Sequence, residues 1–316
     1  ATISIAENGK IERIANIPDT ASVGYIYSSV TRYMGMVPNE HEYKIMGLAP
    51  YAKPKETQKL KKLLYEILAF KNDDLIWKRA SNITTFELGK RFKKIFEFER
   101  FDIIAGATQE FTEEVLTELV KRNMKHFNID RGALIRGVFM NVKANQKISE
   151  LATLSDIYIM PSWGDETNAI GAAYEFYAKP LQSKDDIKGL NGNFCIGPSL
   201  SNSQVEKDLE AYKNEFDIRF EQNIEEIIAK LLAKNEVVAR VNGNMEFGAR
   251  ALGHRSILAN PSSFENVKII NDMIKKRDFW MPFAGSYLEE SQEEYLINPK
   301  KIDSPYMIIT FDKHKK

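Results

Sequence analysis

The chain lacks most of the features that mark secreted and membrane proteins. Its 316 residues include one cysteine, Cys195, so no intrachain disulfide can form, which fits a reducing compartment. No apolar run approaches the roughly 18 residues of a membrane-spanning helix. The first residues lack the charged, apolar and cleavage regions of a signal peptide. These absences predict a cytoplasmic protein that makes no contact with a membrane.

An excess of either charge is also absent. Lys plus Arg and Asp plus Glu both total 44, so the formal net charge is zero. A protein that binds nucleic acid through bulk basic charge carries an excess of Lys and Arg, so nucleic acid is not an expected partner. Hydrophobic residues make up 43% and charged residues 28%, as in a globular protein with a sizeable core, and the length allows two domains.

Common catalytic and metal-binding patterns are missing as well. No Ser-His-Asp order, CxxC or HExxH motif occurs, and the four histidines lie far apart, at His41, His126, His254 and His314. A metal site would therefore need ligands that are distant in sequence or missing from this chain.

Apolar periodicity predicts an α/β chain. In the first part we expect a β-hairpin over 3–14 around Asn8-Gly9, helices over 22–36, 56–70 and 106–127, a Gly/Pro-rich loop over 39–54, and strands over 133–139 and 157–161. A linker over 179–202 separates these elements from helices over 203–214 and 224–232 and from a buried strand over 237–241.

The most informative stretch is GNMEFGARALGHRSILANP at 243–261, which we call the glycine–arginine loop. Glycine recurs at Gly243, Gly248 and Gly253, and this residue tolerates positive φ and lets backbone N–H groups approach a ligand closely. The stretch does not end in the Gly-Lys-Ser/Thr of a P-loop. The loop therefore has the backbone of a ligand-binding turn without matching the commonest nucleotide motif.

The side chains of this loop indicate which ligand it suits. Arg250 and Arg255 each offer a planar fork of donors that fits two phosphate or carboxylate oxygens, and Ser256 adds a hydroxyl. These groups predict an oxyanion site, most simply for a phosphate or an acyl phosphate. The alternative is a turn-rich surface loop whose arginines are solvated.

Three further groups each have a functional and a structural interpretation. Asp165 precedes a predicted helix, where an aspartate is either a cap or a metal ligand. Lys275 and Arg277 either complete the phosphate site or complement the dipole of a helix end. Glu42 and Lys44 would share one side of an extended segment, but on their own they indicate a solvated loop with a surface ion pair.

Taken together, these motifs resemble the O-carbamoyltransferase family, which includes nodulation and antibiotic-tailoring enzymes. The family's blocks occur in its order as PNEHEYKIMGLAPY (38–51), RGVFMNVKANQKI (136–148), SWGDETNAIGAA (162–173), GNMEFGARALGHRSILANP (243–261) and NDMIKKRDFWMPFAGSYLEE (271–290). The resemblance covers roughly residues 22–307, and the block around 246–258 is very specific.

The resemblance implies an α/β protein with part of an actin-like ATPase-fold domain at 1–180, followed by part of a YrdC-like α/β domain at 190–316. It implies that carbamoyl phosphate and ATP form carbamoyl-adenylate in the second domain. The first domain would then pass the carbamoyl group to a hydroxyl of a small-molecule acceptor. Rival interpretations are a tRNA threonylcarbamoyl-type or hydrogenase-maturation enzyme, or a non-catalytic nucleotide-binding fragment.

The resemblance also assigns residues by position, although it names no catalytic residue. The residues implied to bind carbamoyl phosphate and ATP are Arg250, Arg255, Ser256, Lys275 and Arg277, those implied to hold the adenylate are Glu42, Lys44, Gly47, Gly137 and Asn141, and the implied ligand of a divalent metal (iron or magnesium) is Asp165.

The chain departs from the family's pattern at several points. Arg136 stands where the family has the first glycine of a GGV block, and Ala249 and Gly285 each replace a proline. The family's histidine-rich metal motif belongs before residue 1 and its closing block after residue 316. We therefore expect a chain that is incomplete at both ends and that either covers its open strand edges by forming a homodimer or aggregates.

Overall fold

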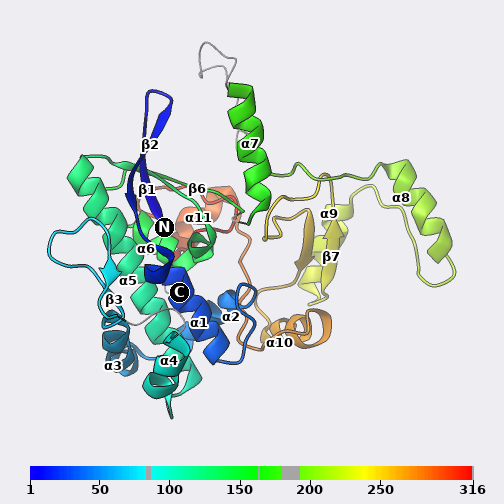
Figure 1. The fold of residues 1–316 in the computed structure, drawn as a ribbon. Helices are drawn as coiled ribbons and strands as arrows, with labels where there is room; N and C mark the ends of the chain where they lie inside the picture. The colour runs from blue at the N-terminus through cyan, green and yellow to red at the C-terminus, as the bar shows by residue number, and fades with distance from the viewer. Residues whose placement is uncertain (83–86, 163, 179–192, 315–316) are drawn as a thin grey trace.

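The computed structural model describes residues 1–82, 87–162, 164–178 and 193–314 (Figure 1). Trp163 and most of the expected linker lie outside the described residues. We call residues 1–178 the first half and residues 193–314 the second half. Among the described residues, no helix combines the length and apolar character that crossing a bilayer requires.

Helix α5 (Phe101–Phe127) is the centre of the first half. Helices α1 (Val23–Tyr33), α3 (Pro54–Tyr65) and α6 (Val142–Ser149) pack against it, and α4 (Leu88–Phe96) packs on α1 and α3. The predicted helix over 106–127 is confirmed, and its apolar residues Phe111, Val115 and Leu119 are buried. The helix begins five residues before the predicted 106, since Ile104 and Ala105 are also buried in its first turns. Burial of this apolar face is the main source of its stability.

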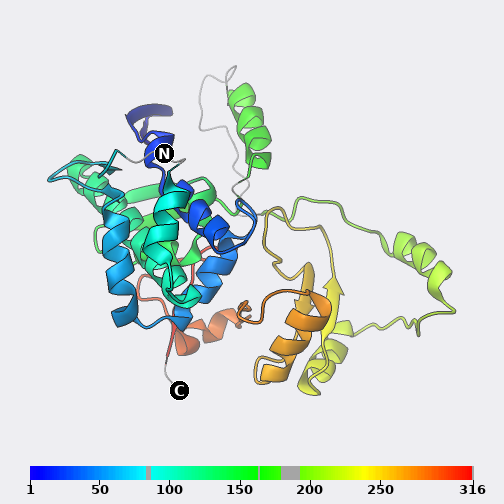
Figure 2. The ribbon, with the colours of Figure 1, turned by 60° about the horizontal axis from the view of Figure 1, so that its bottom comes forward.

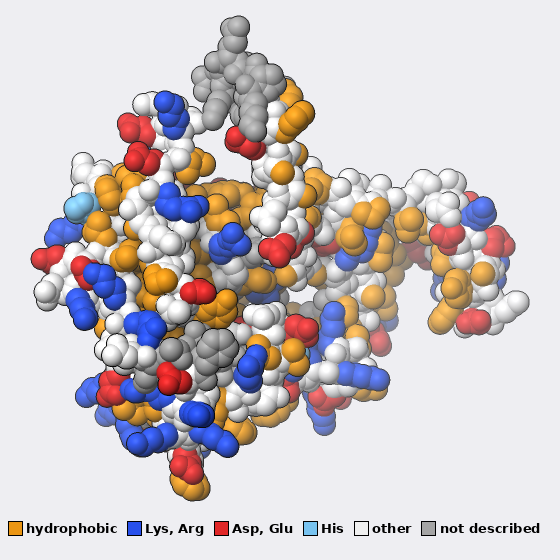
Figure 3. All heavy atoms as spheres, in the orientation of Figure 1, with side chains coloured by type: hydrophobic (Ala, Val, Ile, Leu, Met, Phe, Trp, Pro, Cys, Tyr) orange, Lys and Arg blue, Asp and Glu red, His pale blue; other side chains and the backbone are white. Residues whose placement is uncertain are grey.

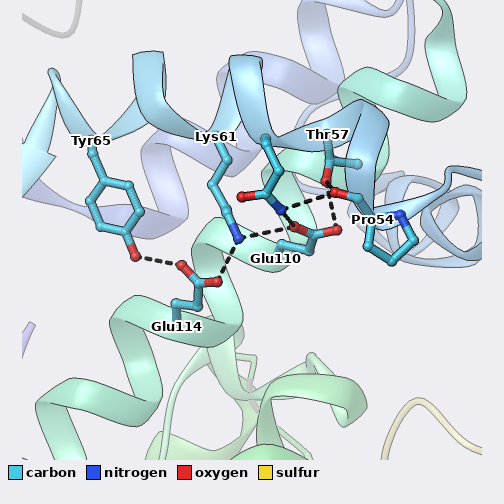
Figure 4. Close-up of polar contacts among 7 residues, drawn as sticks. Pro54, Thr57, Lys61, Tyr65, Glu110 and Glu114 are labelled. Carbon is cyan, nitrogen blue, oxygen red and sulfur yellow. Dashed lines mark hydrogen bonds and ion pairs between the residues drawn. The ribbon is translucent and has the colours of Figure 1, made fainter.

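Polar side chains also join α3 to α5 along one edge of their contact (Figure 4). Lys61 Nζ lies 3.1 Å from Glu110 Oε2 and 2.6 Å from Glu114 Oε1, and Tyr65 donates a hydrogen bond of 2.8 Å to Glu114. Burial, together with the Glu114 carboxylate, raises the pKa of the Tyr65 hydroxyl. The network pairs the charges of the two helices where their apolar faces end.

The strands form five small sheets of two strands each within the described residues. The predicted hairpin is confirmed as β1 (Thr2–Glu7) and β2 (Lys10–Asn16), and the other pairs are β3 (Leu68–Ala69) with β4 (Lys78–Arg79), β5 (Arg131–Leu134) parallel to β6 (Asp156–Ile159), β7 (Val238–Val241) with β8 (Arg255–Leu258), and β9 (Leu296–Ile297) with β10 (Asp312–Lys313). The chain is therefore α/β, and the actin-like and YrdC-like domains remain predictions.

The second half is smaller and more open (Figure 2). Its elements are α8 (Asn202–Leu209), which lies on an extended arm, α9 (Ile224–Ala233), the β7–β8 pair, α10 (Phe264–Lys268) with the π-helical turn Ile269–Ile274, and the short α11 (Gln292–Tyr295). Acidic and basic side chains are interspersed over most of the visible face, as the balanced composition predicts (Figure 3). Helix α7 (Glu166–Ala178) stands away from the rest of the first half (Figure 1).

The C-terminal residues return to the core of the first half, which the sequence did not indicate. Ile308 and Ile309 are buried in the same apolar cluster as α5. Asn145 on α6 donates a hydrogen bond of 2.7 Å to the Ile308 carbonyl, and Lys300 donates one of 2.8 Å to the Leu154 carbonyl. The halves are therefore held together by packing as well as by the connecting chain.

The predicted loop over 39–54 is wrong, because residues Glu42–Leu48 form helix α2. Glu42 is the first residue of this helix, and its Oε1 accepts hydrogen bonds from Asn39 N at 2.7 Å and Ser28 Oγ at 2.8 Å, which ties the helix start to the preceding turn and to α1. Burial of Ile45 against the first half then outweighs the helix-breaking tendency of the nearby glycine and proline.

Two predicted strands also differ from the structure. The strand over 133–139 ends at Leu134, because Arg136 has φ 95° and ψ 161°, which removes the backbone from the sheet. The strand over 237–241 is half-exposed rather than buried, since β7 pairs only with β8 and Val241 is 67% exposed. A two-stranded sheet has too few neighbours to bury both of its faces.

The backbone conformation of Arg136 is strained, so relieving it should stabilise the protein. Its φ and ψ lie in a region that is essentially confined to glycine, the residue found there in the resembling family. We expect Arg136→Gly to raise the free energy of unfolding by about 1–2 kcal/mol, after allowing for glycine's greater entropy in the unfolded chain. Arg136→Ala removes the charge but keeps the strain, so it should give no gain in a urea titration. Equal effects of the two variants would contradict this account.

Candidate functional site

The glycine–arginine loop connects β7 to β8 and contains the three expected left-handed turns. Gly243, Gly248 and Gly253 have φ values of 53°, 113° and 101°, which confirms the role predicted for them. A Cβ atom on Gly248 would lie 3.1 Å from the carbonyl oxygen of Pro161. The loop thus touches the segment just after β6 closely enough that only glycine fits without strain.

Glu246 organises the interior of this loop. The residue is 8% exposed, and its Oε1 accepts hydrogen bonds from the backbone N–H groups of Leu252 (2.8 Å), His254 (2.8 Å) and Arg255 (3.0 Å). Burial by itself would raise the pKa of Glu246, but these N–H donors outweigh it and lower the pKa to about 2. The carboxylate is therefore ionised at neutral pH and fixes the path of the chain around Arg250.

The two arginines of the loop have different surroundings. Arg255 donates to four backbone carbonyls, those of Asn242 (3.1 Å), His254 (3.0 Å), Gly243 (3.2 Å) and Pro198 (3.4 Å). Arg250 is half-buried, no described hydrogen bond or ion pair involves its guanidinium, and burial lowers its pKa. A desolvated guanidinium without a partner favours an incoming anion. The Ser256 hydroxyl, in contrast, already accepts a hydrogen bond of 2.9 Å from Gly253 N.

A second cationic group follows the π-helical turn. Arg277 donates from Nε to Asn271 Oδ1 at 2.5 Å, and its Cζ lies 4.5 Å from the centre of the Phe283 ring. Lys275 is exposed. Within the described part of the chain, no hydrogen bond or ion pair joins Lys275 or Arg277 to Arg250. The described contacts therefore fix the orientation of Arg277 and do not connect it to Arg250.

The residues implied to hold the adenylate come from two parts of the first half, helix α2 and the turn that follows β5. Glu42 and Lys44 lie on helix α2, so they do not share one side as an extended segment would require. Lys44 pairs with Asp278 of the second half at 2.8 Å, and Gly47 packs against Pro282. The surface-ion-pair interpretation of Lys44 was incomplete, because its ion pair joins the two halves.

Asn141 and Gly137 lie at the carboxyl end of β5. Asn141 is buried and caps α6, and its Oδ1 accepts from Ala144 N (3.1 Å) and Gln109 Nε2 (2.8 Å). Gly137 faces open space, with no heavy atom within 4 Å of a Cβ built there. Asn141 therefore shapes the turn, while Gly137 leaves room beside it, and their contact with an adenylate stays a prediction.

Asp165 does not form a metal site with its described neighbours. Its side chain is exposed, and its backbone carbonyl accepts from Asn168 N at 3.0 Å in the first turn of α7. No group of three or more His, Cys, Asp or Glu side chains that could hold an ion occurs among the described residues. Protein metal sites take three or four such ligands, so the donors described here do not fit a bound ion.

Sequence reasoning assigned no role to Glu246, Asn271 or Asp278. Glu246 lies between glycine turns whose N–H groups need an acceptor, and this was the available signal. Asn271 and Asp278 act on Arg277 and Lys44 through tertiary contacts, which leave no local pattern.

Comparison with known proteins matches most of the chain. The model described as "Carbamoyltransferase N-terminus" matches residues 2–174, and the one described as "Carbamoyltransferase C-terminus" matches residues 229–316. The second match includes the glycine–arginine loop and Arg277, and the first includes α2 and Asn141.

Several curated proteins are similar over nearly the whole chain. An uncharacterized protein of Methanocaldococcus jannaschii, MJ1058, is 35% identical over 92% of this chain and 48% of its own length. Nodulation protein NolO of Bradyrhizobium diazoefficiens is 30% identical over 94% of this chain and 54% of its own, and nodulation protein NolNO of Sinorhizobium fredii is 29% identical over 96% and 45%. The chain spans about half the length of the curated relatives it matches.

Proposed function

Because this chain belongs to the carbamoyltransferase family, we propose that it takes part in ATP-dependent O-carbamoyl transfer from carbamoyl phosphate to a hydroxyl of a small molecule. Water would first cleave carbamoyl phosphate to carbamate and phosphate. A carbamate oxygen would then attack the α-phosphorus of ATP, which forms carbamoyl-adenylate and releases pyrophosphate. The acceptor hydroxyl would then attack the carbamoyl carbon, and AMP would leave with the bonding electron pair. Similarity to nodulation proteins supports the reaction class and leaves the acceptor open.

One observation carries the first step. Arg250 is half-buried and makes no hydrogen bond or ion pair with the described residues, and it lies in a loop whose shape is held by the ionised Glu246. Negative charge that develops on a phosphoryl group is stabilised by fixed cations in a partly buried site, where water cannot screen them. We assign Arg250 to bind the phosphoryl oxygens of carbamoyl phosphate or ATP, and Arg277 to assist from the neighbouring segment.

Exchange of labelled pyrophosphate into ATP tests this proposal. If the chain forms carbamoyl-adenylate reversibly, label should enter ATP only when carbamoyl phosphate is present. Binding of ATP without exchange would favour a nucleotide-binding module. Neither binding nor exchange, with a folded chain, would remove the proposed function.

The described side chains do not form a complete metal site, and this predicts a low metal content for the purified chain. We expect the purified chain to hold far less than one equivalent of iron or magnesium, because Asp165 offers one carboxylate where about three or four ligands are needed. Metal analysis after dialysis, with and without a chelator, measures this. A stoichiometric metal that resists dialysis would show that other residues supply ligands. We assign no step of the reaction to a metal held by these residues.

A further inference from the structure

Helix α2 of the first half contacts the segment of the second half that follows Arg277, residues 278–282. Lys44 Nζ lies 2.8 Å from Asp278 Oδ2, and the two side chains are 18% and 30% exposed. Trp280 Nε1 donates a hydrogen bond of 3.2 Å to the backbone carbonyl of Lys44. One residue of α2 is therefore held twice by the segment that follows Arg277.

Beside this ion pair, Gly47 of α2 packs closely against residues 280–282. A Cβ atom built on Gly47 would lie 3.4 Å from Pro282 Cδ and 3.6 Å from both Met281 Sδ and Trp280 Cδ1. Gly47 is buried, so the segment rests directly on the helix backbone. We call the contact of Lys44 and Gly47 with residues 278–282 the α2 latch.

The same segment determines where Arg277 points. Asn271 is 1% exposed, and its Oδ1 accepts from Arg277 Nε at 2.5 Å while its Nδ2 donates to the Met281 carbonyl at 3.3 Å. The Arg277 guanidinium also stacks on Phe283. Because Met281 belongs to the latched residues and Phe283 follows them directly, movement of the latch would move the groups that orient Arg277.

We propose that Lys44 positions Arg277 through Asp278, and that it acts in this way rather than as a direct ligand of the adenylate. Its ammonium is already paired and mostly buried, and its carbonyl is already bonded to Trp280. Asp278 is then a positioning residue that makes anion binding in the second half depend on α2 of the first. This inference rests on the proposed function for the identity of the anion and on the described contacts for the coupling.

Charge reversal separates positioning from ligation. Lys44→Asp and Asp278→Lys should each speed hydrogen exchange of backbone amides in 277–283 and weaken ATP binding by about tenfold, the size of a typical coupling between sites. The double variant restores an ion pair of opposite polarity, so we expect exchange and ATP affinity to return to within about threefold of the original chain. A direct ligand role for Lys44 predicts instead that the double variant stays as weak as Lys44→Asp.

The exposed pair Lys59–Glu99, also 2.8 Å apart, provides the matched control. Lys59→Asp should alter neither hydrogen exchange in 277–283 nor ATP affinity. Asp278→Asn keeps the side-chain shape and gives a readable result where a reversal fails to fold. Single variants with unchanged amide exchange would overturn the latch. If the original chain binds no ATP, the proposed function fails, while recovery of slow exchange in the double variant still supports the latch.

Discussion

Replacing Arg250 by alanine should weaken binding of ATP or carbamoyl phosphate by about 2–4 kcal/mol, because a charge-assisted contact in a partly desolvated site is lost. The described structure shows no hydrogen bond or ion pair of this guanidinium, so the melting temperature should change little. Calorimetric titration with each ligand, beside thermal unfolding, measures the two effects separately. Arg250→Lys should recover little affinity, since an ammonium cannot reproduce the two-pronged contact.

Arg255 supplies the comparison within the same loop. On sequence grounds, both arginines are expected to act mainly in binding phosphate. In the structure, however, the guanidinium of Arg255 donates hydrogen bonds to four backbone carbonyls. We therefore expect Arg255→Ala to lower stability clearly, and to weaken binding as a consequence of the disordered loop. Unchanged ligand affinity in Arg250→Ala would remove this loop from the proposed phosphate site.

A second large effect is expected at Glu246. Replacing this residue by alanine should lower the free energy of unfolding by about 3 kcal/mol. The substitution leaves the N–H groups of Leu252, His254 and Arg255 without their charged acceptor in a site that is largely closed to water. Glu246→Gln keeps an acceptor oxygen but loses the charge, so it should fall between the original chain and the alanine variant. Urea titrations at pH 7 measure all three chains.

The same carboxylate gives the loop a defined pH dependence. The pKa of Glu246 falls from an ordinary 4.5 to about 2 on folding, so its stabilisation is complete above pH 4.5 and is lost as the pH falls towards 2. Between pH 5 and pH 3 the original chain should therefore lose more stability than Glu246→Gln, which has no carboxylate to protonate. Equal losses in the two chains would show that Glu246 is not held in its ionised form.

Local patterns were sufficient for several parts of this molecule. The spacing of Phe111, Val115 and Leu119 predicts α5, because buried positions recur with the helical period. Asn8-Gly9 predicts the hairpin, since both residues accept the positive φ of its turn. Local patterns failed at α2. Burial of Ile45 and the hydrogen bond that Glu42 accepts from Asn39 N favour a helix there, although the glycine and proline content predicts a loop.

The sequence by itself determined the family blocks, the α/β character and the glycine turns of the glycine–arginine loop, because periodicity and glycine positions report backbone geometry directly. Only the tertiary structure decided which side chains within those blocks already have partners and which are available to bind a ligand. It distinguished Arg250, which has no hydrogen-bond or ion-pair partner among the described residues, from Arg255, which donates to backbone carbonyls, and it placed Lys44 beside Asp278. The physical reason is that availability depends on burial and on partners from distant segments, and neither quantity is encoded in the spacing of neighbouring residues.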